Sequence, residues 1–126
     1  MSLKWAISPE QETVAVLVTD PTTPDEVTAF VRALREANAM GYRKVLDITL
    51  MARTWTGGDL QTLAWAFEKA AGQGPRGPVA IVARSHVAQE LAAEYAAISK
   101  PTRPFAVFAE SDEARRWLDS LMEPKG

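Results

Sequence analysis

The side chains that could do chemistry gather at two points of this chain. Residues 53–59, Arg-Thr-Trp-Thr-Gly-Gly-Asp, combine a guanidinium, two hydroxyls, a tryptophan and a pair of glycines. Residues 84–86, Arg-Ser-His, place a hydroxyl next to an imidazole. Free amides at a helix start bind anions, exposed aromatic side chains favour interfaces, and a hydroxyl with an imidazole is the starting point of nucleophilic catalysis. Anion binding, docking and catalysis are therefore the three chemistries to weigh.

Each of these segments also has a simpler structural explanation. A glycine pair is typical of a tight turn, whereas a phosphate loop needs a glycine-rich segment that ends in Lys-Ser or Lys-Thr. Asp59 would repel an anion at the start of a helix. Ser85 is a good N-cap, and neighbouring residues at a helix start rarely point at each other. We therefore predict no catalytic residue and no enzyme activity, with anion binding at 56–58 as the alternative to a turn.

Asp47 is a third candidate, because it ends an apolar stretch that is predicted to be a strand. An ionised carboxylate in apolar surroundings is costly unless it is hydrogen-bonded. The structural explanation ties it to backbone amides of the following turn. The functional alternative makes it an acid at the end of a strand, where ligands are often met.

The pattern of apolar residues predicts one α/β domain over residues 1–126, with the element order ββαβαβαβα. A short polar turn after the first strand favours an antiparallel hairpin. Helices between the later strands imply parallel pairing, so the five-stranded sheet should be mainly parallel, with four helices. The strands are expected near residues 4–8, 13–19, 44–49, 79–83 and 105–108.

Capping signals predict where the helices begin and end. Thr23 and Glu26 can form a capping box at the start of the first helix, and Gly41 is expected to supply a left-handed residue after its end. The second helix should begin near residues 56–59. There we expect Gly57 and Gly58 to pack closely against neighbouring backbone.

Composition argues against several classes of protein. The 126 residues carry a net charge of −2 and are 47% hydrophobic, which is ordinary for a soluble globule and gives no basic footprint for nucleic acid. With no cysteine and one histidine, we predict no metal site and no cofactor. The longest apolar runs are about five residues, far below the roughly 18 of a membrane span. No signal peptide pattern is visible, so a cytoplasmic location is expected.

Two motifs carry a family resemblance. Residues 42–47 read Tyr-Arg-Lys-Val-Leu-Asp, and residues 107–118 read Val-Phe-Ala-Glu-Ser-Asp-Glu-Ala-Arg-Arg-Trp-Leu. With a tryptophan in the first strand and this element order, the chain resembles the STAS domain, the superfamily of bacterial anti-sigma-factor antagonists and sulphate-transporter tails. More narrowly it resembles the small SpoIIAA-like bacterial proteins. The resemblance implies a sheet wound as a β/α superhelix, an architecture shared with the CRAL-TRIO lipid carriers.

The chain departs from this family at its phosphorylation motif. In the anti-sigma antagonists, the turn before the second helix holds Asp-Ser-Ser-Gly, and its first serine is phosphorylated to switch partner binding. Aligned on Asp47, that serine position falls on Gly57, which has no hydroxyl. Thr54 and Thr56 would accept a phosphoryl group only in a shifted register. The resemblance therefore implies partner binding without the serine switch, and related small proteins suggest a homodimer.

The function predicted from these observations is a non-enzymatic STAS-like module that docks a protein partner or a small ligand of unknown identity. The alternative is a carrier of a lipid or other small apolar molecule, which would need an internal pocket of a few hundred Å³. Strands rich in alanine and short helices leave little obvious room for one. The predicted binding residues are Arg53, Thr54, Trp55, Thr56, Gly57, Gly58 and Arg84.

Overall fold

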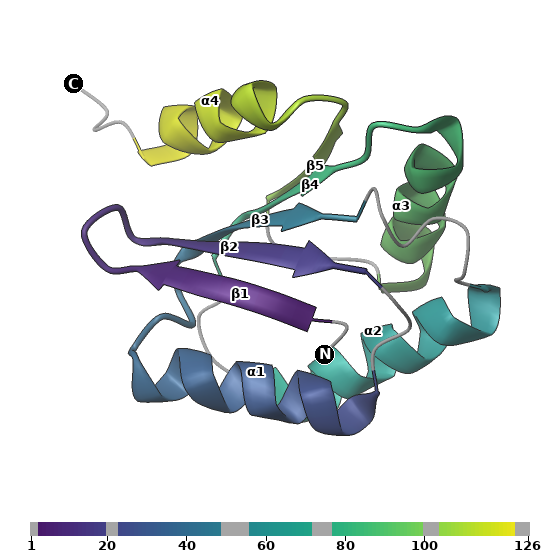
Figure 1. The fold of residues 1–126 in the computed structure, drawn as a ribbon, viewed down its shortest axis with the longest axis horizontal. Coiled ribbons are helices and arrows are strands. Elements are labelled where there is room, and N and C mark those ends of the chain that lie inside the picture. The colour runs from purple at the N-terminus through teal and green to yellow at the C-terminus, as the bar shows by residue number, and fades with distance from the viewer. Residues whose placement is uncertain (1–2, 20–22, 49–55, 72–76, 100–103, 123–126) are drawn as a thin grey trace.

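A computed structural model describes residues 3–19, 23–48, 56–71, 77–99 and 104–122 (Figure 1). Within these ranges the elements follow the predicted order ββαβαβαβα. The strands are β1 (Leu3–Ser8), β2 (Thr13–Val18), β3 (Arg43–Asp47), β4 (Val79–Val82) and β5 (Phe105–Phe108). The helices are α1 (Pro24–Glu36), α2 (Gly57–Ala71), α3 (His86–Ser99) and α4 (Ser111–Met122).

The strands form one mixed sheet whose spatial order, β1-β2-β3-β4-β5, is the same as their order in the chain. β1 pairs with β2 in antiparallel orientation, and all later pairs are parallel, as predicted. Ala15, Val45, Ala80 and Ala106 lie side by side across the four parallel strands. Each crossover therefore moves the chain by one strand in the same direction.

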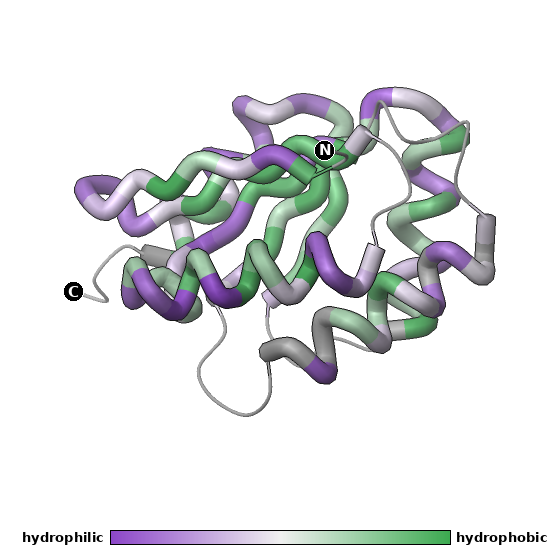
Figure 2. The backbone as a smooth tube through the Cα atoms, turned by 60° about the horizontal axis from the view of Figure 1, so that its bottom comes forward, coloured by the Kyte–Doolittle hydropathy of each residue, from purple (hydrophilic) through white to green (hydrophobic). Residues whose placement is uncertain are grey.

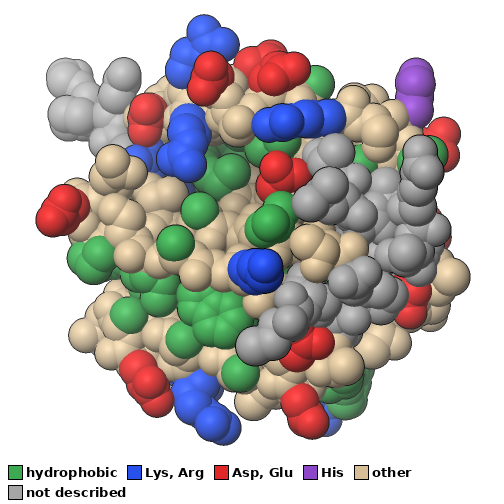
Figure 3. Space-filling view, in the orientation of Figure 1, with side chains coloured by type: hydrophobic (Ala, Val, Ile, Leu, Met, Phe, Trp, Pro, Cys, Tyr) green, Lys and Arg blue, Asp and Glu red, His purple; other side chains and the backbone are tan. Residues whose placement is uncertain are grey.

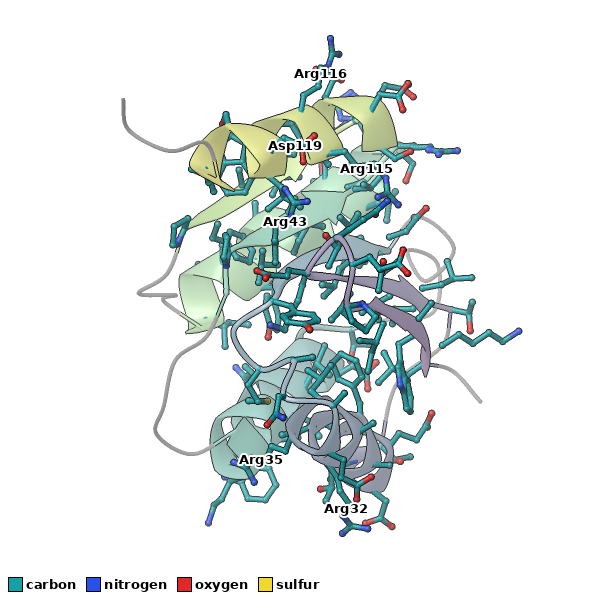
Figure 4. All side chains as sticks on the ribbon, turned by 90° about the vertical axis from the view of Figure 1, so that its left-hand side faces the viewer. Arg32, Arg35, Arg43, Arg115, Arg116 and Asp119 are labelled. Carbon is teal, nitrogen blue, oxygen red and sulfur yellow. The ribbon has the colours of Figure 1, made fainter. Side chains whose placement is uncertain are left out.

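The helices lie in two layers on either side of the sheet. α1, α2 and α3 cover one face, and α4 lies alone on the other (Figures 1 and 4). Because side chains alternate along a strand, Val79 and Ile81 enter the core under α1–α3, while Ala80 and Val82 enter the core under α4. All four residues of β4 are buried, as the uninterrupted apolar run of this strand predicts. Figure 2 shows long hydrophobic stretches in the strands at the centre of the molecule, and alternating polar and apolar segments along the helices.

The start of α1 is as predicted, but its end is not. Thr23 and Glu26 form a reciprocal capping box, with the Glu26 amide donating to the Thr23 hydroxyl at 3.2 Å. The expectation that Gly41 supplies the left-handed residue is wrong, because the helix ends at Glu36 and Asn38 adopts a φ of 55°. The Ala39 amide then donates to the Leu34 carbonyl at 2.7 Å, which closes the helix end.

The loop between α1 and β3 is held by a buried lysine and a buried glycine. Lys44 is only 6% exposed, and its Nζ donates to the carbonyl oxygens of Met40 and Tyr42 at 2.9 and 2.8 Å. The Gly77 amide donates to the same Met40 carbonyl at 3.3 Å. The chain entering β4 is therefore pressed against the loop entering β3, and charge-assisted bonds from Lys44 fix that loop.

Candidate functional site

The structure describes four of the predicted binding residues. Arg53, Thr54 and Trp55 lie outside the described residues. Thr56 precedes α2, Gly57 and Gly58 are its first two residues, and Arg84 is an exposed residue shortly after β4. Because β3 and β4 are neighbouring parallel strands, the segments that follow them leave the same edge of the sheet.

Thr56 and Asp59 form a reciprocal capping box at the start of α2. The Thr56 amide donates to Asp59 Oδ2 at 2.8 Å, and the Asp59 amide donates to Thr56 Oγ1 at 3.2 Å. Thr56 therefore caps α2, and the helix begins within the predicted range 56–59. The carboxylate of Asp59 already satisfies one amide here and places a negative charge at the helix start, where an anion would otherwise bind. This geometry favours the turn over the anion site.

The expected close packing of Gly58 is wrong. A Cβ built on Gly58 would meet only the Thr56 hydroxyl oxygen, at 3.7 Å, which is ordinary van der Waals contact. Gly58 is exposed at the helix start, so no neighbouring backbone comes near it. Gly57 is the first residue of α2, and its expected close packing stays a prediction.

We expect Gly58→Ala to raise the free energy of unfolding by up to about 1 kcal/mol, since alanine loses less backbone entropy in a helix than glycine. Urea denaturation followed by circular dichroism measures the effect. As a control, Thr56→Ala removes the cap and should lower stability by about 1 kcal/mol. A clear loss of stability in Gly58→Ala would show a constraint on this glycine that the contacts do not contain.

The hydroxyl–imidazole pair serves the start of α3. Ser85 Oγ accepts the Ala88 amide at 3.1 Å, which confirms the predicted N-cap. His86 is the first helical residue and is exposed. The Ser85 oxygen therefore accepts a hydrogen bond as the helix cap. That Ser85 and His86 do not form a nucleophile–base pair stays a prediction.

A hollow on the α4 face of the sheet was missed by the sequence reasoning. It has a volume of about 430 Å³ and lies between β1–β3 and the start of α4. Asp47 is half-buried and contributes to its wall, so the third candidate residue does face an open site. The lining residues are Lys4, Trp5, Ala6, Ala15, Val16, Leu17, Val45, Asp47, Val82, Ser111 and Arg115.

A second hollow of about 500 Å³ lies between the β1–β2 turn and the later part of α4. Both hollows include Val45 and Arg115 in their walls, and together we call them the α4 groove. Figure 3 shows charged side chains along α4 at the top of the molecule, with hydrophobic side chains below them. The second hollow is lined by Glu10, Gln11, Thr13, Arg43, Val45, Arg115, Leu118 and Asp119.

The α4 groove exists because a single helix is too narrow to cover all five strands of the sheet. Strands lie about 4.8 Å apart, so five of them are about 19 Å wide, whereas a helix is about 10 Å across. α4 packs on β3, β4 and β5 through Ala114 and Leu118. Within the part of the chain that the structure describes, β1 and β2 therefore remain open on this face, where they present Ala6 and Ala15. The alanines of β1 and β2 were the feature of the sequence that could have indicated this groove.

The described residues contain neither a membrane-spanning helix nor a cluster of metal-binding side chains. No helix among them is long and apolar enough to cross a membrane. No three His, Asp or Glu side chains within the described ranges gather closely enough to hold a metal ion. The chain matches no family model, no curated protein and no solved structure.

Proposed function

We propose that this protein is a non-enzymatic interaction module of the STAS-like, SpoIIAA-like kind, and that it docks a protein partner on the α4 face of its sheet. The observation that carries the proposal is the uncovered half of that face. Ala6 and Ala15 are directly paired in the β1–β2 register and leave a shelf of small side chains. Leu17 extends the shelf toward the carboxyl end of β2 and is half-buried. A flat apolar shelf with a charged rim is a common design of docking surfaces.

The topology supports the family part of the proposal. Sheet order that follows chain order, with three crossover helices on one face and the last helix on the other, agrees with a β/α superhelix. Gly57 begins α2 and has no hydroxyl, so we propose partner binding that is constitutive or controlled by a ligand. The hollow beside the shelf reaches Leu17, Asp47 and Val82 at the carboxyl ends of β2–β4, the end of the sheet after which Thr56 and Arg84 follow. The docking surface is proposed to include both.

A protein partner fits the groove better than an enclosed apolar ligand does. Both hollows of the groove are open to solvent. Charged side chains contribute to both walls, including Lys4, Asp47 and Arg115. A lipid carrier buries most of its ligand in an apolar cavity, because exposed acyl chain would retain its cost of hydration. The carrier is therefore the alternative that the experiment has to separate.

The test places a photo-crosslinking amino acid at Ala6 or at Leu17, and at Arg32 as the control. Arg32 lies on the far side of the molecule, on α1 (Figure 4). We expect the two shelf positions to give one reproducible protein adduct in cells and Arg32 to give none. Adding Ala15→Arg beside position 6 should abolish the adduct while the circular dichroism spectrum stays native.

The remaining outcomes would contradict the docking proposal or change its partner. An adduct between two copies of the chain would assign the shelf to the expected homodimer. A stoichiometric apolar molecule released from the purified protein, detected by native mass spectrometry, would favour the carrier. Equal labelling at Arg32 and at the shelf would remove the evidence for a docking face.

A further inference from the structure

Arg43, at the start of β3, has a guanidinium that neutral groups hold in place from two sides. Its Nε donates to Thr13 Oγ1 at 3.1 Å, and its Nη2 donates to the Gln11 carbonyl at 3.2 Å. The side chain is only 13% exposed. These bonds fix the plane of the guanidinium without neutralising its charge, and they leave Nη1 directed toward α4. The arginine is thus pre-organised to bind a negative group.

The negative group on Arg43 is the carboxylate of Asp119. Nη1 of Arg43 lies 2.6 Å from Asp119 Oδ1. The side chain of Asp119 is 66% exposed, so water and salt screen the pair and its contribution to stability is small. A carboxylate from another molecule could take this position, because the exposed Asp119 side chain can turn into solvent.

A second guanidinium lies on the same side of α4. Arg115 is one helical turn before Asp119, is exposed, and contributes to the walls of both hollows. Among the described residues, no hydrogen bond or ion pair to Arg115 is found. Figure 4 shows Arg115 and Arg43 in the space between α4 and the sheet, with Asp119 above them. Two guanidiniums therefore share one hollow with two carboxylates, that of Asp119, which is bound to Arg43, and that of Glu10.

We propose that Arg43 and Arg115 bind a small dicarboxylate in the second hollow of the α4 groove, and that Asp119 occupies the Arg43 position in the absence of ligand. A carboxylate is the group that the structure shows on Nη1, and two guanidiniums match two carboxylates. The volume of about 500 Å³ is in the range of small-molecule sites. Glu10 also lines the hollow, so two guanidiniums face one remaining carboxylate once Asp119 turns into solvent. The site lies toward the β1–β2 turn, whereas the docking shelf extends toward the carboxyl end of β2, and the two adjoin at Val45 and Arg115.

The experiment is a titration of the protein with succinate, followed through the Nε–Hε signals of its arginines by nuclear magnetic resonance. We expect saturable shifts at Arg43 and Arg115. Arg115→Gln should weaken binding at least tenfold. Asp119→Asn should strengthen binding several-fold, because it removes the internal competitor. A merely structural Arg43–Asp119 pair would not produce this gain.

Matched variants on α4 control for general charge effects. Arg116→Gln and Asp112→Asn change the same charges at exposed positions outside the groove and should leave the succinate affinity unchanged. The proposal would be overturned if the chemical shifts changed linearly with succinate concentration and by the same amount at Arg116 as at Arg43 and Arg115. A loss of succinate affinity in Asp119→Asn would also overturn it. Tighter, Arg115-dependent binding of inorganic phosphate would overturn the carboxylate class. None of these results depends on a protein partner, so they are separate from the crosslinking outcome.

Discussion

Replacing Gly77 by alanine should destabilise the protein by about 3 kcal/mol or more, because the new methyl group has no space. A Cβ at this position would collide with the carbonyl oxygens of Tyr42 and Gly41. Both are backbone atoms, so no side-chain rotation can relieve the overlap. The loop that Lys44 holds would have to move away from β4. The loss should appear as a lower midpoint of urea unfolding.

Gly41→Ala is the matched control for this prediction. A Cβ on Gly41 would have no atom within 4 Å, and its side would face open space. We expect a change of less than about 0.5 kcal/mol, as for other exposed substitutions. Equal destabilisation by both substitutions would show that the loop tolerates no change in backbone entropy. The close approach of backbone at Gly77 would then not be the cause of the lost stability.

Leu118→Ala should cost about 3 kcal/mol, the range found for buried leucines that leave a cavity. Leu118 is 1% exposed and packs with Val45, Ala80, Val82 and Ala114 in the core under α4. This core is small, so few side chains can move in to fill the space. Thermal or urea unfolding measures the loss.

Leu121→Ala on the same helix provides the comparison, since Leu121 is 43% exposed and should change stability by less than about 1 kcal/mol. Hydrogen exchange adds a local readout, because amides of α4 should lose protection in Leu118→Ala before amides of β2 do. Similar losses in the two variants would mean that α4 is not held through Leu118.

The parts of the fold that could be predicted depend on neighbouring residues in the sequence. Thr23 and Ser85 cap helices through amides three residues away, so their roles are visible in a short window. The apolar run of β4 likewise predicts cover on both faces without knowledge of the partners. The alternation in β1 is visible in the sequence too, but the nearly continuous β-branched run of β2 favours cover on both faces, which α4 does not provide.

The parts that could not be predicted depend on contacts between distant segments. Gly77 needs to be glycine because of Tyr42, which lies 35 positions earlier in the printed sequence. Arg43 gains its place in the α4 groove from Thr13 and Asp119, on two other elements. Asn38 rather than Gly41 ends α1 because Ala39 is drawn into the core, where it is fully buried. Local propensity favours glycine at such a position, and packing overrode it.

The agreement between strand order in space and strand order in the chain has a consequence for synthesis on the ribosome. After the β1–β2 hairpin, each new strand joins an edge that already exists, and no later strand has to insert between two earlier ones. Chains emerge at about 5–20 residues per second, so the edge that each new strand needs has already been synthesised when that strand appears. α4, made last, then packs mainly on the strands made most recently, β3 to β5. The hairpin that emerged first is the part of the sheet that this last helix leaves largely open.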